Sequence, residues 1–597
     1  MLIHTIPRSK IFHEEGQEVA NIPGTKPPFI LQLKNSRAIG SGDSEARPMV
    51  GGQVGSHFAK EIAFCDPPTS LPVAKIARVP RLFNFQLSSR FSIEVFTLLE
   101  EARRFFTLGC GKMTRKYNLN NMTDYGKSST VPQYIAALSI CLGAVAAGAV
   151  LGWTANISDA LKTGNLNDIP IDKDSLGWIG SFVNLGAMVM CIPIGYICDL
   201  IGRKLSCLLT VVPFLLGWFL IVFADGVPMI YAGRFLTGLA GGAFCVAAPI
   251  YTSEIAENRI RGALGSYFQL LLTVGILIAY VAGAFISPKS LAILSLCIPV
   301  VFGVVFFFQP ETPVYYLKND KYEAAKASLR RLRGEAYDCE PELKEMRLSL
   351  EQNSSGRASF FDVLLTKAGV RACVITFSLM FFQQMSGVNA VIFYTGDIFS
   401  AAGSSLKAST ATIIVGVLQT VTTFVSSLVV DKFGRKLLLL LSILFMGLSE
   451  FVLALYFTFK NRNVLDEETV ESIGVLPLLC LGIYIVMFSM GIGPIPWMIS
   501  AELMAPEIKS VMVSIAATFN WFLAFLVTKF YGNISDAIGA DSPFYIFSGI
   551  CFAGAAFMVM FVPETKGKSV AEIQAMLGGE KPQEVAKEGI DNPSFKY

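Results

Sequence analysis

The chain has 597 residues, of which 53% are hydrophobic and 16% are charged. Soluble domains carry about 25% charged residues, so this composition excludes an ordinary soluble protein and predicts a membrane protein with several spans. The formal net charge of +3 indicates no nucleic-acid partner. All three histidines, His4, His13 and His57, precede the first long apolar run, so the membrane body has none for metal binding or proton transfer. We therefore expect no metal and no cofactor.

Residues 1–130 contain clusters of Pro, Gly and Ser and no apolar run of membrane length. Such a segment cannot bury enough apolar surface to fold by itself, so we predict a mostly disordered cytoplasmic tail. A short amphipathic helix over residues 91–106, lying at the inner membrane face, is the alternative interpretation of part of this tail.

Twelve long apolar runs follow, and each is near the roughly 20 residues that a helix needs to cross the hydrocarbon core. The predicted spans are residues 131–153, 176–198, 205–224, 227–250, 264–285, 290–308, 370–395, 410–430, 437–457, 475–500, 511–531 and 543–562. We predict an all-α membrane protein with six-helix bundles over 131–309 and 370–562, a helical linker over 310–369 and a C-terminal tail over 563–597.

The Lys and Arg residues of the loops are unevenly divided between the two sides of the membrane. The 310–369 linker is rich in both, whereas the loops on the opposite side carry few. Because positively charged loops remain in the cytoplasm, we predict that the linker and both termini are cytoplasmic.

The two halves of the chain repeat three charged motifs in the same order. An Asp-x-x-Gly-Arg-Lys turn follows the second and eighth runs, an acid and a base seven positions apart follow the fourth and tenth, and Pro-Glu-Thr follows the sixth and twelfth. Duplicated halves around a central site are the architecture of alternating-access transporters. Acids and bases at neighbouring helix ends can pair, so we predict a cytoplasmic gate; the alternative is positive-inside anchoring without a switching role. The predicted gate residues are Asp199, Arg203, Glu254 and Arg261 in the first half and Asp431, Arg435, Glu502 and Lys509 in the second.

Three carboxamides, Gln383, Gln384 and Asn389, interrupt the seventh run. Buried in hydrocarbon without partners, these groups would be costly. We therefore expect them to face a hydrated cavity and to bind a ligand with many hydroxyl groups. The Ser386-Gly387 pair is predicted to break this helix.

The tenth run contains Pro494 and Pro496, which remove backbone donors and break a spanning helix. A broken helix is tolerated in a membrane where its backbone lines a cavity. Trp497 follows the break and offers an apolar face for a sugar ring and one N–H donor. Asn520 and Gln269 are further polar candidates, although a helix–helix hydrogen bond explains Gln269 equally well.

Residues 131–575 resemble the sugar-porter branch of the major facilitator superfamily, and within it the insect facilitated trehalose transporters. The resemblance rests on the paired Asp-x-x-Gly-Arg-Lys turns, the Pro-Glu-Thr motifs, the Gln-Gln-Met-Ser-Gly-Val-Asn stretch that begins at Gln383 and the Gly-Pro-Ile-Pro-Trp stretch that ends at Trp497. It implies the twelve-helix major facilitator fold and transport of sugar. It also implies that the sugar is contacted by Gln269, Gln383, Gln384, Asn389, Gln419, Trp497 and Asn520.

Two departures from the resemblance weaken the case for a glucose-selective site. Met380-Phe381-Phe382 replaces the Gln-Leu-Ser of several glucose facilitators, and Ser489 stands where those proteins often have Glu.

The first run contains no carboxylate, and Thr154 occupies the position at which the resemblance places an Asp in proton-coupled sugar porters. Glu450 in the ninth run is the conspicuous acid of the membrane body, and we expect it to be a buried protonated or interfacial group. The prediction is a facilitative uniporter of the plasma membrane with trehalose as the first-choice substrate. A glucose or hexose facilitator, a proton-coupled sugar symporter and a transporter-like nutrient sensor remain the alternatives.

Other classes fit the sequence poorly. A lipid or drug exporter would need an apolar cavity, which the carboxamides contradict. The sequence contains no constellation of catalytic residues, so we do not expect the protein to be an enzyme. Asn156 and Asn533 begin Asn-x-Ser sequences in predicted external loops and are candidate glycosylation sites.

Overall fold

The computed structural model describes residues 128–257, 259–355, 360–402, 407–462, 473–568 and 570–579. These residues fall in one compact unit, Asn118–Tyr597, and contain helices but no strand. Nearly all of the predicted N-terminal tail, including the alternative helix over 91–106, lies outside the described residues, as does the chain beyond residue 579.

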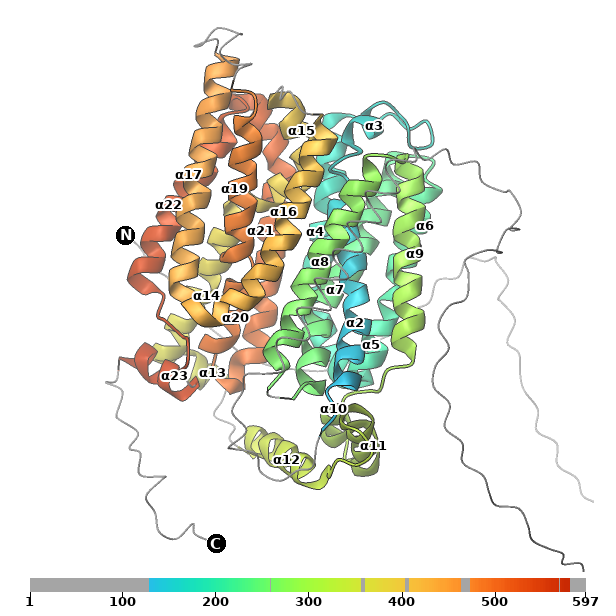
Figure 1. Cartoon of the computed structure of the whole chain (residues 1–597), viewed down its shortest axis with the longest axis vertical. Helices are drawn as coiled ribbons and strands as arrows, with labels where there is room; N and C mark the ends of the chain where they lie inside the picture. Colours follow the sequence, from blue (N-terminus) through green and yellow to red (C-terminus); the bar gives the residue numbers. More distant parts are fainter. Residues whose placement is uncertain are drawn as a thin grey trace, which may run out of the picture. The chain divides into compact units, whose positions relative to one another are not determined.

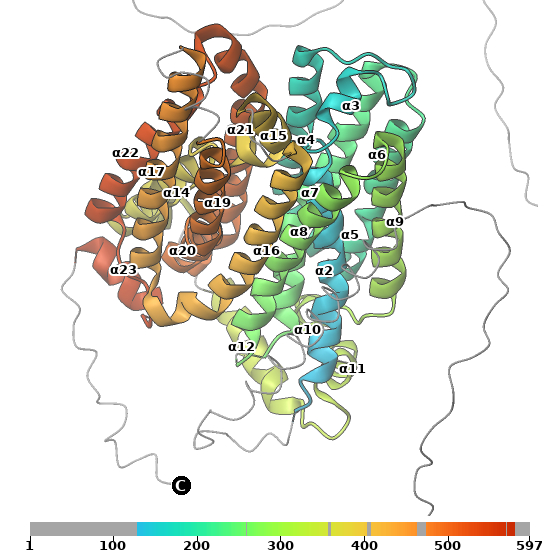
Figure 2. The same ribbon diagram turned by 45° about the horizontal axis from the view of Figure 1, so that its top comes forward.

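Twelve helices or helix pairs among the described residues are long and apolar enough to cross a membrane, which confirms the predicted number and order of spans. In the first half they are α2 (Val131–Gly152), α4 (Lys173–Ile201), α5 with α6 (Arg203–Leu209 and Val211–Val222), α7 (Val227–Ile255), α8 (Arg261–Gly283) and α9 (Pro288–Phe307). In the second half they are α14 with α15 (Lys367–Met385 and Val388–Ala402), α16 (Ala408–Phe433), α17 (Arg435–Asn461), α19 with α20 (Leu476–Met490 and Ile495–Leu503), α21 (Pro506–Ile538) and α22 (Ser542–Phe561). Figures 1 and 2 show each half gathered into a bundle of its own.

Short helices lie at both ends of the two bundles (Figure 1). The helix α3 (Ser158–Lys162) lies at one end, which we call the α3 end. The opposite end, which we call the linker end, carries α10 (Pro313–Lys318), α11 (Tyr322–Arg333), α12 (Glu340–Ser355), α13 (Phe360–Leu364) and α23 (Val570–Gly578).

The helices at the linker end are fastened to different bundles. In α11, Arg333 Nη1 donates to the carbonyl of Ile255, the last residue of α7, at 2.8 Å. In contrast, Arg371 Nη1 of α14 donates to the carbonyl of Leu577 in α23 at 2.7 Å. The first bundle therefore holds α11, and the second bundle holds α23.

Glycines allow the closest packing inside the first bundle, where α4 crosses α7. A Cβ atom at Gly186 would lie 2.1 Å from the carbonyl oxygen of Phe235, and one at Gly238 would lie 2.1 Å from that of Val183. Neither distance leaves room for a side chain, so the two backbones approach as small residues permit in membrane helix pairs.

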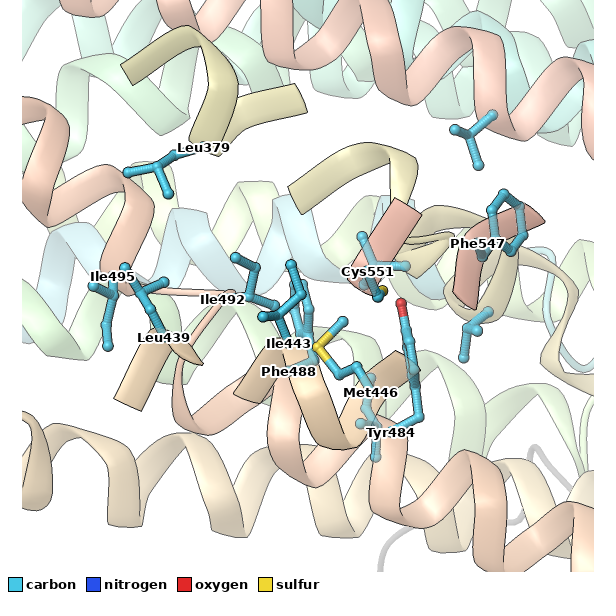
Figure 3. Packing of buried hydrophobic residues seen from close by; sticks show 14 of the residues in the cluster. Leu379, Leu439, Ile443, Met446, Tyr484, Phe488, Ile492, Ile495, Phe547 and Cys551 are labelled. Atoms are coloured by element: carbon cyan, nitrogen blue, oxygen red, sulfur yellow. The ribbon is translucent and has the colours of Figure 1, made fainter. Parts of the chain in front are cut away.

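Larger apolar side chains fill the second bundle, in which α17 packs against both α19 and α22. Figure 3 shows Ile443 and Met446 of α17 beside Phe488 and Tyr484 of α19, with Cys551 of α22 nearby. This apolar core also includes residues of the two broken helices and supports them.

The seventh span breaks where the sequence predicts. Helix α14 ends at Met385, and Gly387 has a φ of +87°, a backbone conformation that favours glycine. A Cβ atom there would also lie 2.4 Å from the ring of Phe547. A second irregularity follows at Tyr394, whose φ and ψ of −117° and 18° kink α15.

Candidate functional site

Four of the predicted ligand residues meet inside the second bundle. Gln383 and Gln384 lie in the last turn of α14, Asn389 in the first turn of α15 and Asn520 in α21. Asn520 Nδ2 donates to Gln383 Oε1 at 2.7 Å, and Gln384 Nε2 donates to Asn520 Oδ1 at 2.8 Å. Asn389 Nδ2 donates to Gln384 Oε1. All four are buried, and we call this hydrogen-bonded set the carboxamide chain.

The carboxamide chain reaches the break between α19 and α20. Gln383 Nε2 donates to the carbonyls of Ile492 and Gly493, both at 2.8 Å. These carbonyls belong to the non-helical turn that separates Met490 from Ile495. Two broken helices are therefore joined through one side chain.

The protein does not use all the hydrogen-bonding capacity of these amides. An amide nitrogen carries two N–H donors and its oxygen has two acceptor lone pairs. Among the described residues, Asn389 Oδ1 accepts no hydrogen bond, and Gln384 Nε2 makes only one. The buried amide of Gln419 in α16 makes none. Neither Asn389 Oδ1 nor the amide atoms of Gln419 are among the fully enclosed polar atoms that lack a partner, so these atoms are open to a small polar molecule.

Besides Gln419, two predicted ligand residues lie outside the carboxamide chain. Gln269 of α8 and Trp497 of α20 are half-buried. Neither side chain forms a hydrogen bond within the described part of the chain. Gln269 is also the single predicted ligand residue on the first bundle, so the structure places the predicted site mainly on the second bundle.

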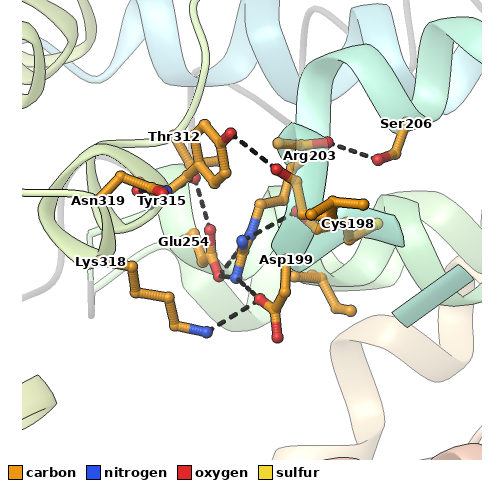
Figure 4. A network of polar contacts seen from close by, with 12 residues as sticks. Cys198, Asp199, Arg203, Ser206, Glu254, Thr312, Tyr315, Lys318 and Asn319 are labelled. Carbon is orange, nitrogen blue, oxygen red and sulfur yellow. Dashed lines mark hydrogen bonds and ion pairs between the residues drawn. The ribbon is translucent and has the colours of Figure 1, made fainter. Parts of the chain in front are cut away.

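Arg203 is the centre of a charged network at the linker end of the first bundle (Figure 4). Its Nε and Nη2 donate to Glu254 Oε1 at 3.1 and 2.9 Å, and Nη2 lies 2.9 Å from Asp199 Oδ1. Lys318 of α10 pairs with the same carboxylate oxygen of Asp199 at 2.9 Å, and Thr312 Oγ1 donates to Glu254 Oε2 at 2.6 Å. Three of the four gate residues predicted for this half are thus in contact, and two further residues complete the network.

Arg261, the fourth residue predicted for this half, lies outside the network. It is exposed, and its Nη2 donates to the carbonyl of Ala256 at 3.4 Å. The spacing from Glu254 to Arg261 crosses the end of α7 and the start of α8. Helical periodicity does not hold through such a turn, so the spacing does not place the two side chains together.

In the second bundle, the contact that corresponds to the Arg203–Glu254 pair is longer. Arg435 Nη2 lies 3.5 Å from Glu502 Oε1. Lys509 lies in the first turn of α21, and the described residues provide no ion pair for it. The side chain of Asp431 lies outside the part of the chain that the structure describes.

The glutamates of the two Pro-Glu-Thr motifs were not assigned from sequence, yet they hold the charged turns. Glu311 Oε2 accepts from the backbone N–H of Lys204 at 2.9 Å. Glu564 accepts from the backbone N–H groups of Arg435 and Lys436, at 3.1 and 3.0 Å. Each carboxylate caps the first turn of the helix that follows an Asp-x-x-Gly-Arg-Lys motif. Their recurrence at the same place in both halves was the available signal.

The pKa values of the two glutamates are shifted in opposite directions. Burial raises the pKa of Glu311 above its ordinary value and outweighs the backbone N–H groups that face this carboxylate. Burial acts in the same direction on Glu564, but backbone N–H groups, led by that of Lys566, outweigh it and lower the pKa of Glu564.

Hydrogen bonds and ion pairs join the two bundles at the α3 end and near the middle of the helices. They pair Thr154 with Phe393, Ser158 and Lys162 with Asp397, Lys173 with Asp536, Asp174 with Lys529, Asn184 with Thr528, Thr273 with Thr420, and Tyr280 with Ile392. At the linker end, no hydrogen bond or ion pair joins described residues of one bundle to those of the other.

Several of these contacts are made to α15 close to its kink at Tyr394. Tyr280 Oη donates to the carbonyl of Ile392 at 2.8 Å, and Thr154 Oγ1 donates to that of Phe393 at 3.5 Å. A Cβ atom at Gly396 would lie 2.3 Å from the carbonyl oxygen of Ala155. The first bundle therefore presses closely on α15.

Two charged side chains are buried within the spans without a charged partner among the described residues. Arg234 donates from Nε to the carbonyl of Ile179 at 3.1 Å and from Nη1 to that of Val150 at 2.9 Å, and its Nη2 has no partner there. Glu450 Oε2 accepts from Cys551 Sγ at 3.5 Å, and its Oε1 has no partner. The burial predicted for Glu450 is present.

The two candidate glycosylation sites differ in accessibility. Asn156 is half-buried, and its Nδ2 donates to the carbonyl of Tyr280 at 2.7 Å. Asn533 is exposed in the last turns of α21. This geometry favours Asn533 over Asn156.

Two six-helix bundles with a polar site on broken helices define the protein as a membrane carrier of the alternating-access class. The sequence profile of the family described as "Sugar (and other) transporter" matches residues 112–577. The chain belongs to this family.

Known relatives agree with this assignment. A "Facilitated trehalose transporter Tret1" of Bombyx mori is 36% identical over 484 residues, which are 80% of this chain and 94% of that protein. The Tret1 of Drosophila yakuba is 38% identical over 448 residues, which are 75% of this chain and 52% of that protein. The chain thus spans about half the length of the latter relative.

Solved structures show the same fold. The xylose transporter XylE from E. coli, in a "partially occluded inward open conformation", has a TM-score of 0.61 and 22% identity over 74% of this chain and 100% of that one. The "MFS (major facilitator superfamily) proton:xylose symporter XylE bound to 6-bromo-6-deoxy-D-glucose" has a TM-score of 0.60 and 25% identity, with coverages of 74% and 99%. The all-α major facilitator fold predicted from the sequence is confirmed.

Proposed function

We propose that the protein is a facilitative sugar transporter that works by alternating access. One observation carries this proposal: Gln384, Asn389 and Gln419 keep unused donors and acceptors in the interior of the second bundle. Sugars present many hydroxyl groups, each of which donates and accepts, and so match a cluster of amides. The half-buried Trp497 adds an apolar ring face for the sugar.

Trehalose is the proposed substrate. The names of the Bombyx and Drosophila relatives support this choice, and Gln419 would offer an amide to a second sugar ring. A hexose facilitator is the alternative, and comparison of trehalose with glucose distinguishes the two.

We further propose that the α3 end faces the exterior and the linker end the cytoplasm of a plasma-membrane protein, with both termini cytoplasmic. The excess of Lys and Arg at the linker end supports this orientation. Since the polar contacts between the bundles gather at the α3 end, the structure corresponds to a state closed toward the exterior. The Arg203 and Arg435 networks are the proposed cytoplasmic gate; each lies within one bundle, so they would act by rearranging when the linker end closes.

Uniport is favoured over proton coupling by the surroundings of two residues. Thr154 is bonded to the carbonyl of Phe393, and Arg234 makes its hydrogen bonds to backbone carbonyls and has no carboxylate partner among the described residues. A coupled carrier needs a titrating group near its sugar site. Glu450 is buried beside Cys551 and forms no hydrogen bond to the carboxamide chain among the described residues. We propose no catalytic role for any residue, and a sugar and the bilayer are the proposed partners.

Purified protein in liposomes tests these proposals with radiolabelled trehalose and glucose. Trehalose should equilibrate across the membrane without accumulating when a proton gradient is imposed. Accumulation above equilibrium would contradict uniport, and uptake of glucose alone would contradict the disaccharide. Uptake of neither sugar would contradict the proposed function itself. Removal of residues 1–127 tests the alternative of a nutrient sensor that signals through this segment. A transporter should retain its sugar flux without these residues.

A further inference from the structure

Two prolines leave two backbone carbonyls without helical donors in the tenth span. In an α-helix the carbonyl of residue i accepts from the N–H of residue i+4. Pro494 and Pro496 have no N–H, so the carbonyls of Met490 and Ile492 lack that donor. An unpaired buried carbonyl is costly, above all in a membrane.

Side chains from neighbouring helices replace both donors. Ser426 Oγ of α16 donates to the carbonyl of Met490 at 3.1 Å, and Gln383 Nε2 of α14 donates to that of Ile492 at 2.8 Å. Ser442 Oγ of α17 accepts from the N–H of Ile492 at 3.0 Å. The side chain of Ile492 packs beside Phe488 in the apolar core (Figure 3).

Gln383 uses more of its hydrogen-bonding capacity within the protein than Gln384 or Asn389 does. Both of its N–H donors point to carbonyls of the break, and its Oε1 accepts from Asn520. Gln384 and Asn389 keep free capacity, as described above. The two adjacent glutamines therefore have different surroundings.

We propose that Gln383 is a positioning residue that clamps the α19–α20 break in the empty carrier and releases it when sugar binds. A sugar hydroxyl can accept from Gln383 Nε2 and donate to the carbonyl of Ile492, so it inserts between the two without leaving either group unpaired. Insertion separates α14 from the break and frees α20 to move. This proposal rests on the proposed sugar transport and assigns the coupling between site occupancy and helix movement.

Transport kinetics provide the first test. A clamp slows the return of the empty carrier, so the wild-type maximal rate of exchange between sugar-loaded sides should exceed the maximal rate of net flux. In Gln383→Leu this ratio should fall toward one. In the adjacent control Gln384→Leu, the half-saturation concentration should rise while the ratio stays unchanged. A wild-type ratio of one, or an unchanged ratio in Gln383→Leu, would overturn the proposal.

Restoring the missing backbone donor provides the second test, which needs no transport. Pro496→Ala returns an N–H to the position that serves the carbonyl of Ile492. It should recover at least half of the melting-temperature loss caused by Gln383→Leu in purified protein. Pro494→Ala returns the donor for Met490 instead and should recover none.

Equal recovery by both prolines, or recovery by neither, would overturn the clamp. If Gln383→Leu alone yields no folded protein, the yield of monodisperse protein from each double variant replaces the melting temperature. Addition of Pro496→Ala should then restore the yield, and addition of Pro494→Ala should not. If the wild-type protein moves no sugar, the proposed function fails, and the melting experiment still decides the clamp.

Discussion

Lys162 Nζ lies 2.7 Å from Asp397 Oδ1 and joins α3 of the first bundle to α15 of the second. Ser158 Oγ donates to the same carboxylate oxygen at 3.1 Å. The side chains of Lys162 and Asp397 are 31% and 23% exposed, whereas those of the neighbouring pair, Lys173 and Asp536, are 75% and 58% exposed. The first pair is therefore the better shielded contact between the bundles at this end.

Asp397→Asn should weaken closure at the α3 end. A partly shielded ion pair contributes at most about 1 kcal/mol, so the equilibrium between the two open states should shift by up to about fivefold. The half-saturation concentration for uptake should then fall relative to that for efflux. Lys173→Gln is the matched control, with little change expected because its pair is well exposed. An equal shift in both variants would show that shielding is irrelevant.

Alanine at either glycine of the charged turns should destabilise the protein. Gly202 has φ and ψ of 98° and 159°, and Gly434 of 89° and 158°, a region that is essentially restricted to glycine. A Cβ atom would also lie 2.4 Å from Glu311 Oε2 at the first position and 2.9 Å from Glu564 Oε2 at the second. We expect each variant to lose about 1–3 kcal/mol of stability, measured by thermal unfolding in detergent.

The control for these variants is Gly262→Ala. Gly262 lies in the first turn of α8, and a Cβ atom there would meet nothing within 4 Å. The stability of this variant should stay unchanged or rise slightly. A loss equal to that of Gly434→Ala would mean that the turn conformation is not the cause.

The opposite pKa shifts of two glutamates predict opposite pH dependences. Because the pKa of Glu564 is lowered in the folded protein, its charged form adds stability above the ordinary value of 4.5, and this contribution is lost as the pH falls through the lowered pKa. Glu564→Gln should therefore lower the melting temperature at pH 7, and the difference from the wild type should shrink below pH 4.5.

Glu311→Gln should show the reverse trend. Its raised pKa means that the folded protein holds a proton which the unfolded chain has already released, so the stability of the wild type falls as the pH rises from 4.5 through the raised value. The disadvantage of the glutamine variant should therefore be smaller at pH 7 than at pH 4.5. Melting curves across this interval, with parallel slopes for the two variants, would contradict the asymmetry.

The glycan should be attached at Asn533 and not at Asn156. The amide nitrogen of Asn156 is bonded to the carbonyl of Tyr280 where α8 packs against the loop after α2, and a glycan would not fit this contact. Asn533→Gln should remove the electrophoretic shift caused by glycosidase, and Asn156→Gln should leave it intact. The opposite pattern would show that this contact forms differently in the glycosylated protein.

The sequence predicted the spans well because membrane length and apolar composition are strong local signals. Its predictions were poorest at the ends: α21 was expected over residues 511–531 but continues over Pro506–Ile538. Its last turns include the exposed polar residues Asn533 and Asp536. Helical hydrogen bonding continues there, although hydropathy falls.

The candidate site was predictable as a set of residue types but not as a set of partners. The sequence placed Gln383, Gln384 and Asn389 in an apolar run, and their mutual hydrogen bonds could not be read from spacing because Asn520 and the proline break lie far away in the chain. The same limit explains why Lys318 and Thr312 were missed in the Arg203 network. Contacts between distant segments follow from the tertiary fold.

The attachment of α11 to α7 and of α23 to α14 has a practical use. Helix α11 should move with the first bundle and α23 with the second. The distance between α11 and α23 therefore reports the angle between the bundles without any label inside the membrane. The distance between a spin label on α11 and one on α23 would follow the movement of the bundles through the transport cycle. Both labels would lie outside the membrane, and the sugar path would stay unmodified.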